Sequence, residues 1–166
     1  HDAVCDIVGT QFRNLATVGG SIFGRFGFSD VMTAFLALDS YVELYKGGVV
    51  PMSEFVKMKR DNDILVRVIV KKQAGHFVYL SHRNTRTDFP VLTVAVSDCG
   101  GVKKAVIGAR PGIAKMYEIE TMDEETAARL QEETCFQSNM RASETFRRHL
   151  AGVLLRRAFG AVQGKE

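Results

Sequence analysis

The 166-residue sequence lacks the long apolar segments that mark membrane and secreted proteins. Its richest apolar run, Val31 to Leu38, is far shorter than the roughly 20 residues that span a bilayer. No basic segment followed by an apolar core marks a signal peptide at the start. The only cysteines, Cys5, Cys99 and Cys135, are scattered, which favours reduced thiols. We therefore expect a cytoplasmic protein with no membrane partner, folded as one domain or as two small ones.

Charge and motif content exclude further classes. A net charge of +3 is too small to argue for a nucleic-acid partner. There is no CxxC pair and the four histidines are not at ligand spacing, so we expect no metal site. The sequence has no GxSxG, HExxH or P-loop motif, and no nucleophile–base pair stands out. We therefore assign no catalytic residue.

The first third of the chain reads as mixed helix and strand. A short helix interrupted by Gly9 is expected over Asp2 to Phe12, and a flexible glycine-rich stretch follows it. Ser29 is a good N-cap, and Asp30 places a carboxylate in the first turn of a helix that should run to Leu38. Alternation of apolar and polar side chains over Tyr41 to Tyr45 predicts a half-buried strand.

A polar segment, Lys57 to Asp63, is the expected boundary between two lobes. Beyond it the sequence predicts an antiparallel meander, because closely spaced strand-like segments are joined by turns. These segments are Ile64–Val70, His76–Ser81, Phe89–Val96 and Val102–Ile107. We therefore expect an α+β fold with one domain over residues 1–57 and a second over residues 64–166.

Two helices are expected at the end of the chain. Thr121 and Glu124 form a capping box that predicts a helix to about Cys135. Ser143 predicts the cap of a last helix, whose apolar face consists of Phe146, Leu150, Val153, Leu154 and Phe159. The four arginines of this helix sit largely off that face and are expected to be solvated; they are Arg147, Arg148, Arg156 and Arg157.

The glycine stretch is the best candidate for chemistry. Gly19 and Gly20 remove two side chains, so backbone N–H groups can approach a ligand phosphate, and Thr17 adds a hydroxyl. Asp30 can accept hydrogen bonds from a sugar or ribityl hydroxyl. From the residues alone the alternative stays open that the glycines form a tight turn and Asp30 only supports its helix. Three nearby phenylalanines either shield a bound ring or pack the core: Phe23, Phe26 and Phe28.

Five collinear segments resemble the FAD-carrying medium subunits of molybdenum hydroxylases, a family that includes xanthine dehydrogenase and carbon monoxide dehydrogenase. Gln11 to Ile22 resembles the family's QIRN-x-ATIGGNI signature. The others resemble its SD-x-x-PALLALDA element, its IPL-x-EF element, its R-x-x-x-x-DFA-x-V-x-VA strand and its DMRASAEYRRHL segment; they are Ser29–Leu38, Val50–Phe55, Arg83–Val96 and Met140–Leu150. Together these matches cover almost the whole chain.

The resemblance implies a set of FAD contacts. The implied cofactor-binding residues are Ile7, Thr17, Gly19, Gly20, Ser21, Asp30 and Leu65. Thr17 and the two glycine amides would line the phosphate and ribityl region, and Asp30 would bind ribityl or ribose hydroxyls. Ile7 and Leu65 would give apolar contacts to the flavin. Two departures are visible: Ser21 replaces the usual asparagine, and the lysine that often follows an aromatic residue in the second lobe is missing after Tyr79.

The resemblance also implies a context for the chain. It implies an electron-transfer subunit that passes electrons between iron–sulfur clusters on a small partner subunit and an acceptor such as NAD, with the molybdenum cofactor on a large molybdopterin subunit. It places a further flavin-binding lobe upstream of the first residue, so this chain would be the second lobe plus the C-terminal domain and would carry little or no FAD alone. The alternative is a non-catalytic fragment that only makes subunit contacts.

Overall fold

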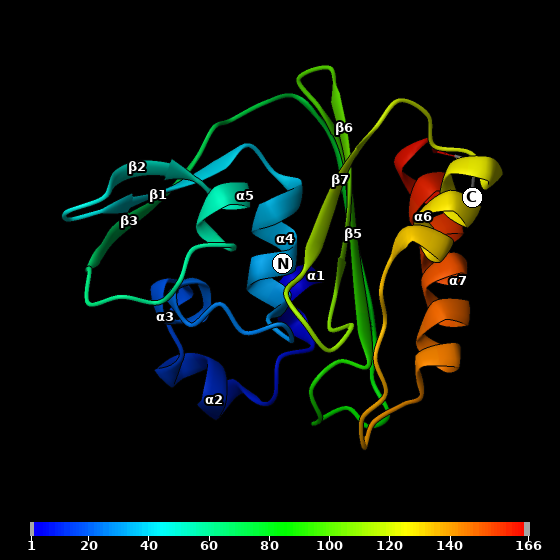
Figure 1. Cartoon of the computed structure of the whole chain (residues 1–166), viewed down its shortest axis with the longest axis horizontal. Helices are drawn as coiled ribbons and strands as arrows, with labels where there is room; N and C mark the ends of the chain where they lie inside the picture. The colour runs from blue at the N-terminus through cyan, green and yellow to red at the C-terminus, as the bar shows by residue number, and fades with distance from the viewer. Residues whose placement is uncertain (1, 165–166) are drawn as a thin grey trace.

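The computed structural model describes residues 2–164, which form two antiparallel sheets and seven helices (Figure 1). The smaller sheet has the strand order β2-β1-β3, from β1 (Ser40–Leu44), β2 (Gly48–Pro51) and β3 (Leu65–Val70). The larger sheet has the order β4-β5-β6-β7, from β4 (Gly75–His82), β5 (Leu92–Cys99), β6 (Val102–Gly108) and β7 (Lys115–Ile119). The predicted α+β class is confirmed.

The helices divide between the two ends of the chain. Five precede the larger sheet: α1 (Asp2–Cys5), α2 (Thr10–Leu15), α3 (Val18–Phe23), α4 (Asp30–Ala37) and α5 (Met52–Phe55). Two follow it, α6 (Glu124–Glu133) and α7 (Glu144–Val162). In Figure 1, α6 and α7 cover one face of the larger sheet, and α4 lies on its other face.

The central strand β5 explains this layering, because its side chains are buried on both faces. Val94 and Val96 belong to the core that α6 and α7 close. Ala95 belongs to the second core, which includes residues of α4 and the smaller sheet. A strand covered on both sides reads as a nearly continuous apolar run, as Leu92–Val96 does apart from Thr93.

Hydrogen bonds fix α4 against the larger sheet. The buried hydroxyls of Thr33 and Thr93 lie 3.1 Å apart, and Ser97 Oγ donates to the carbonyl of Ala37 over 2.5 Å. A Cβ on Gly108 would come within 2.1 Å of Thr33 Oγ1, so only glycine permits this approach. The first turn of α4 is thereby held close to the end of β4.

Two features of the sheets differ from the prediction. The first predicted strand of the meander, β3, pairs with β1 in the smaller sheet, with Tyr41 opposite Ile69. The larger sheet gains β7 instead, whose mixed sequence gave no clear alternation. Pairing partners depend on long-range packing, so local patterning could not assign them. The predicted boundary at Lys57–Asp63 lies between α5 and β3, and the division into domains stays a prediction.

Helix boundaries follow the prediction with two exceptions. Ser29 and Ser143 cap α4 and α7 as predicted, and the first helix is interrupted at Gly9, where φ is 60°, also as predicted. The glycine stretch, expected to be flexible, forms the short helix α3. Helix α6 begins later than predicted because the Asp123 side chain, not Thr121, accepts from the N–H of Thr126.

The prediction of a solvated arginine face was wrong for Arg147, which is 1% exposed. Its guanidinium donates to three carbonyls and to the Asn139 side chain; the carbonyls belong to Val91, Gln137 and Ala142. Burial lowers the pKa of Arg147 from its ordinary value. The charge is tolerated because every direction around it offers a hydrogen-bond acceptor.

Candidate functional site

An apolar pocket of about 480 Å³ lies where α4 begins. Residues from the α1–α2 connection, α2, α3, α4 and the loop after β4 converge on it. They are Ile7, Val8, Phe12, Ala16, Thr17, Gly20, Ser21, Phe26, Phe28, Ser29, Asp30, Val31, Arg83 and Phe89. A concave, mostly apolar pocket with a few polar groups is the usual form of a small-molecule site.

The structure brings most of the sequence-predicted site residues to this pocket. They are Ile7, Thr17, Gly20, Ser21 and Asp30. The other two do not line it. Gly19 and Leu65 lie beside each other instead, since a Cβ on Gly19 would be 3.7 Å from Leu65 Cδ2. Their assignment as cofactor contacts stays a prediction.

The short helix α3 organises the polar rim of the pocket. Thr17 is its N-cap, and its Oγ1 accepts from the Gly20 N–H over 3.0 Å. Ser21 Oγ donates to the Thr17 carbonyl, also over 3.0 Å. A Cβ on Gly20 would approach Thr17 Oγ1 to 2.9 Å, so glycine here preserves the cap. The hydroxyls and amides of this turn therefore have fixed directions at the pocket edge.

Aromatic rings form one wall. Phe26 and Phe28 stack with centroids 5.2 Å apart and planes 9° apart, and Phe28 contacts Phe89 with centroids 4.4 Å apart. Phe12, on α2, is 53% exposed. The sequence left the role of three phenylalanines open; Phe26 and Phe28 line the pocket, whereas Phe23 packs in the core near Phe55. Such a wall suits a planar aromatic ligand.

A buried hydrogen-bonded group lies at the start of α4. The Asp30 carboxylate accepts from the Tyr79 hydroxyl and from Arg83 Nη2, each over 2.5 Å at Oδ1. Burial, and then the negative charge of Asp30, raises the pKa of Tyr79 well above its ordinary value, so the phenol remains a donor. Sequence reasoning missed Tyr79 and Arg83, which are 49 and 53 positions from Asp30. The only sequence signal was the arginine at the head of the R-x-x-x-x-DFA segment.

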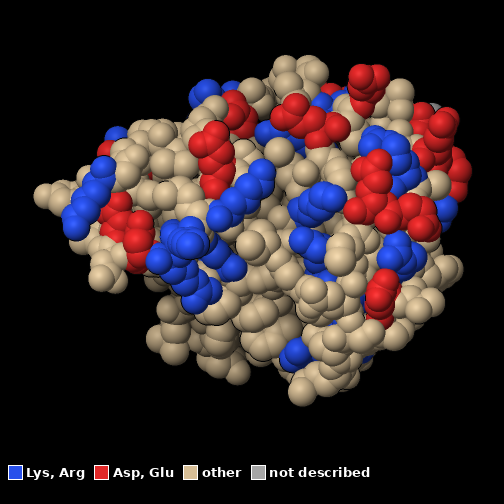
Figure 2. Space-filling model, in the orientation of Figure 1, with Lys and Arg blue, Asp and Glu red and all other residues tan. Residues whose placement is uncertain are grey.

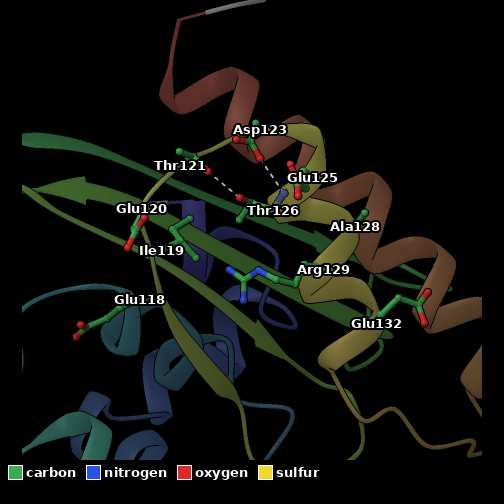
Figure 3. Close-up of a pocket in the computed structure, with 10 residues that line it drawn as sticks. All are labelled: Glu118, Ile119, Glu120, Thr121, Asp123, Glu125, Thr126, Ala128, Arg129 and Glu132. Atoms are coloured by element: carbon green, nitrogen blue, oxygen red, sulfur yellow. Dashed lines mark hydrogen bonds between the residues drawn. The ribbon is translucent and has the colours of Figure 1, made fainter.

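A larger, open groove of about 870 Å³ lies between β7 and α6. Figure 3 shows its glutamates arranged along the rim, with Thr121, Asp123 and Thr126 hydrogen-bonded to one another at the start of α6. Those polar groups cap the helix. Within residues 2–164, no three His, Cys, Asp or Glu side chains are grouped to hold a metal ion. The groove therefore offers no comparable set of inward-directed groups.

The surface near the apolar pocket and the surface near the groove between β7 and α6 differ in charge. On the face seen in Figure 2, acidic side chains gather over α6, whereas the surface around α2 is formed by uncharged side chains. In the part of the chain that the structure describes, no helix is long and apolar enough to cross a bilayer. All three cysteines are free.

Comparison with known proteins matches part of the chain to a flavin-binding family model and the whole fold to solved structures. Residues 1–72 match the family model described as the FAD binding domain in molybdopterin dehydrogenase. The protein YgfM of Escherichia coli K12, described as uncharacterized, is 24% identical over 160 residues, covering 93% of this chain and 61% of its own length.

Two solved structures share the fold. Quinoline 2-oxidoreductase from Pseudomonas putida 86 matches with a TM-score of 0.81 and 20% identity, over 99% of this chain and 66% of that chain. Carbon monoxide dehydrogenase from Hydrogenophaga pseudoflava matches with a TM-score of 0.83 and 17% identity over the same shares. The chain thus spans about two thirds of the length of these proteins. By its match to the FAD binding domain and by its fold, the chain resembles the FAD-carrying subunits of molybdenum hydroxylases, as its sequence motifs predicted.

Proposed function

We propose that this chain is part of the FAD-binding subunit of a molybdenum hydroxylase, and that the apolar pocket at the start of α4 takes part of the FAD. One observation carries the proposal. Five of the seven residues that the family resemblance names line one pocket, and all five lie in the segment that matches the FAD binding domain; they are Ile7, Thr17, Gly20, Ser21 and Asp30.

The residues present fit a flavin in kind. The phenylalanine wall offers apolar faces to a planar ring and excludes water from it. Thr17 and Ser21, at the pocket edge, offer hydroxyl oxygens for the polar part of the cofactor. Asp30 offers a carboxylate for ribityl or ribose hydroxyls. FAD, when bound, supplies the redox chemistry, and the protein orients it.

The wider role follows from the same proposal. The subunit would pass electrons between iron–sulfur clusters on a small partner subunit and an acceptor such as NAD, while a molybdopterin subunit carries the molybdenum cofactor. The chain spans about two thirds of its relatives' length, so we propose that a complete flavin site takes further contacts from the remaining third. The alternative is a fragment that makes only subunit contacts. Such a fragment would bind no FAD.

Two matched substitutions test where FAD binds. Ala16 is exposed and lines the apolar pocket. Ala128 is exposed and lines the groove between β7 and α6. A tryptophan at either position fills its cavity without entering the core. We expect Ala16→Trp to abolish FAD binding in an equilibrium fluorescence titration and Ala128→Trp to leave the dissociation constant unchanged.

Far-UV circular dichroism of both variants checks that each is folded. Equal FAD binding by the wild type and folded Ala16→Trp would place the cofactor elsewhere. No binding by the wild type at any FAD concentration would favour the non-catalytic alternative.

A further inference from the structure

Arg83 is a buried charge that no part of the family resemblance assigns to the cofactor. Its side chain is 8% exposed, and it lines the apolar pocket. Nη2 donates to Asp30 over 2.5 Å and Nη1 to the carbonyl of Asp88 over 2.9 Å. Its Nε is buried and, among the residues that the structure describes, has no hydrogen-bond partner. Of the three guanidinium nitrogens, Nε is therefore the one that donates to no described residue.

The partner of Arg83 is the pocket carboxylate itself. The Asp30 side chain is 7% exposed and is held by two residues from the second half of the fold, Tyr79 within β4 and Arg83 just after that strand. A buried carboxylate without a positive partner is costly, and it would repel the phosphates of FAD. Arg83 cancels that charge and fixes the direction in which Asp30 presents its oxygens.

We propose that Arg83 is a positioning residue for FAD, which acts by holding Asp30 neutralised and oriented at the pocket and by keeping one donor free for a ligand oxygen. The inference rests on the proposed function. An unsatisfied buried N–H costs about 1–3 kcal/mol. If the Arg83 N–H is unsatisfied in the free protein and donates to a ligand oxygen in the complex, the removal of this cost favours binding. Arg147, which does not line this pocket, differs in that each of its three guanidinium nitrogens donates to an acceptor within the protein.

A matched pair of arginines allows the test. Arg141 also pairs with a carboxylate near the same loop, with Nη2 2.8 Å from Asp88, but its side chain is 25% exposed and does not line the pocket. The variants are Arg83→Met, Arg83→Lys and Arg141→Met in the full 166-residue chain. FAD is titrated and followed by its fluorescence, visible circular dichroism of bound FAD reports its surroundings, and melting without FAD reports stability.

We expect the FAD dissociation constant to rise on the order of tenfold or more in Arg83→Met, since an unpaired buried charge costs at least one such factor. Arg83→Lys keeps the charge but not the planar fork, so its dissociation constant should lie between those of the wild type and Arg83→Met. The visible circular dichroism should change in the same order. Arg141 lies over the Phe89 ring at the pocket wall, 5.2 Å from its centroid, so Arg141→Met should weaken FAD binding less than Arg83→Met does, even where its melting temperature falls.

Equal dissociation constants and spectra for the wild type and both folded Arg83 variants would overturn the inference. If Arg83→Met does not fold, Arg83→Lys decides: weaker binding by a folded variant supports the inference, and wild-type binding overturns it. Absence of FAD binding by the wild-type chain would instead overturn the proposed function, and this inference with it.

Discussion

At Asp88 a single ion pair ties the loop after β4 to the segment before α7. Hydrogen bonds from Arg141 lower the pKa of Asp88 below its ordinary value of 3.8, and a further hydrogen bond from the N–H of Phe89 lowers it too. Desolvation acts in the opposite direction but is outweighed. A carboxyl whose pKa is lower in the folded state stabilises the fold above the unfolded value, and this contribution is lost as the pH falls through the folded value.

We therefore expect Asp88→Asn to melt at a lower temperature than the wild type at neutral pH. In acid the melting temperatures of the two proteins should converge. The difference in melting temperature should shrink as the pH falls below 3.8. Thermal melts of both proteins across that range test this. A difference that stays constant with pH would mean that the charge of Asp88 contributes nothing.

Arg147 gives the largest stability effect that we expect from one side chain. Arg147→Met would leave three backbone carbonyls and the Asn139 oxygen without their donor. Unsatisfied buried groups cost about 1–3 kcal/mol each, so a loss of about 3 kcal/mol or more in the free energy of unfolding is expected. Arg157, exposed on the same helix, is the control, and Arg157→Met should change stability by less than about 0.5 kcal/mol. Urea denaturation of both variants decides; similar losses would refute the role given to Arg147.

From the sequence we could predict candidate site residues by their chemical type, but not which side chains are buried. Asp30 was recognised from its place after a capping serine and in a family motif. Its partners could not be, because Tyr79 and Arg83 reach it only through the packing of α4 on the larger sheet. Arg147 was misjudged for the same reason: burial of a charge depends on acceptors that distant segments supply.

Gly19 and Gly20 both lie in α3 and were given the same predicted role from the sequence, but their surroundings in the structure differ. Gly19→Ala should keep or raise stability, by up to about 1 kcal/mol, because alanine favours helix and its Cβ meets Leu65 at an ordinary 3.7 Å. Gly20→Ala should lower stability, because its Cβ would crowd the Thr17 hydroxyl that caps the helix. Gly20 lines the pocket, so FAD affinity should fall in the second variant, and a fall in the first variant would support the predicted Gly19 contact as well.

Melting curves and FAD titrations of the two variants test this contrast. Loss of FAD binding by a folded Gly19→Ala variant would show that Gly19 belongs to the site after all.

Local signals predicted most elements well. The serine caps and the alternation over β1 depend on neighbouring residues, and the structure has them where they were expected. The partner of β3 and the existence of β7 depend on which strand edges meet in space. Glycine content also misled, since α3 is helical: a cap at Thr17 and the apolar Ile22, fully buried, outweigh two glycines.

For the whole molecule, the pocket joins the two parts of the chain that the sequence predicted to be separate lobes. Its rim comes from α1 to α4, whereas Arg83 and Phe89 come from the loop after β4. Flavin binding and the packing of α4 on the larger sheet should therefore be coupled. The family motifs could place FAD on this chain, but only the fold brings Ile7, Asp30 and Arg83 to one cavity.

The most direct test of this account is an equilibrium titration of FAD with the purified 166-residue chain, followed by the visible absorbance and fluorescence of the flavin. We expect saturable one-to-one binding in the presence of excess FAD. We also expect the flavin to be lost on gel filtration, because the pocket is open and, under the proposed function, a complete site takes further contacts from the third of the relatives' length that this chain does not span. Flavin signals that remain those of free FAD throughout the titration would contradict the central claim.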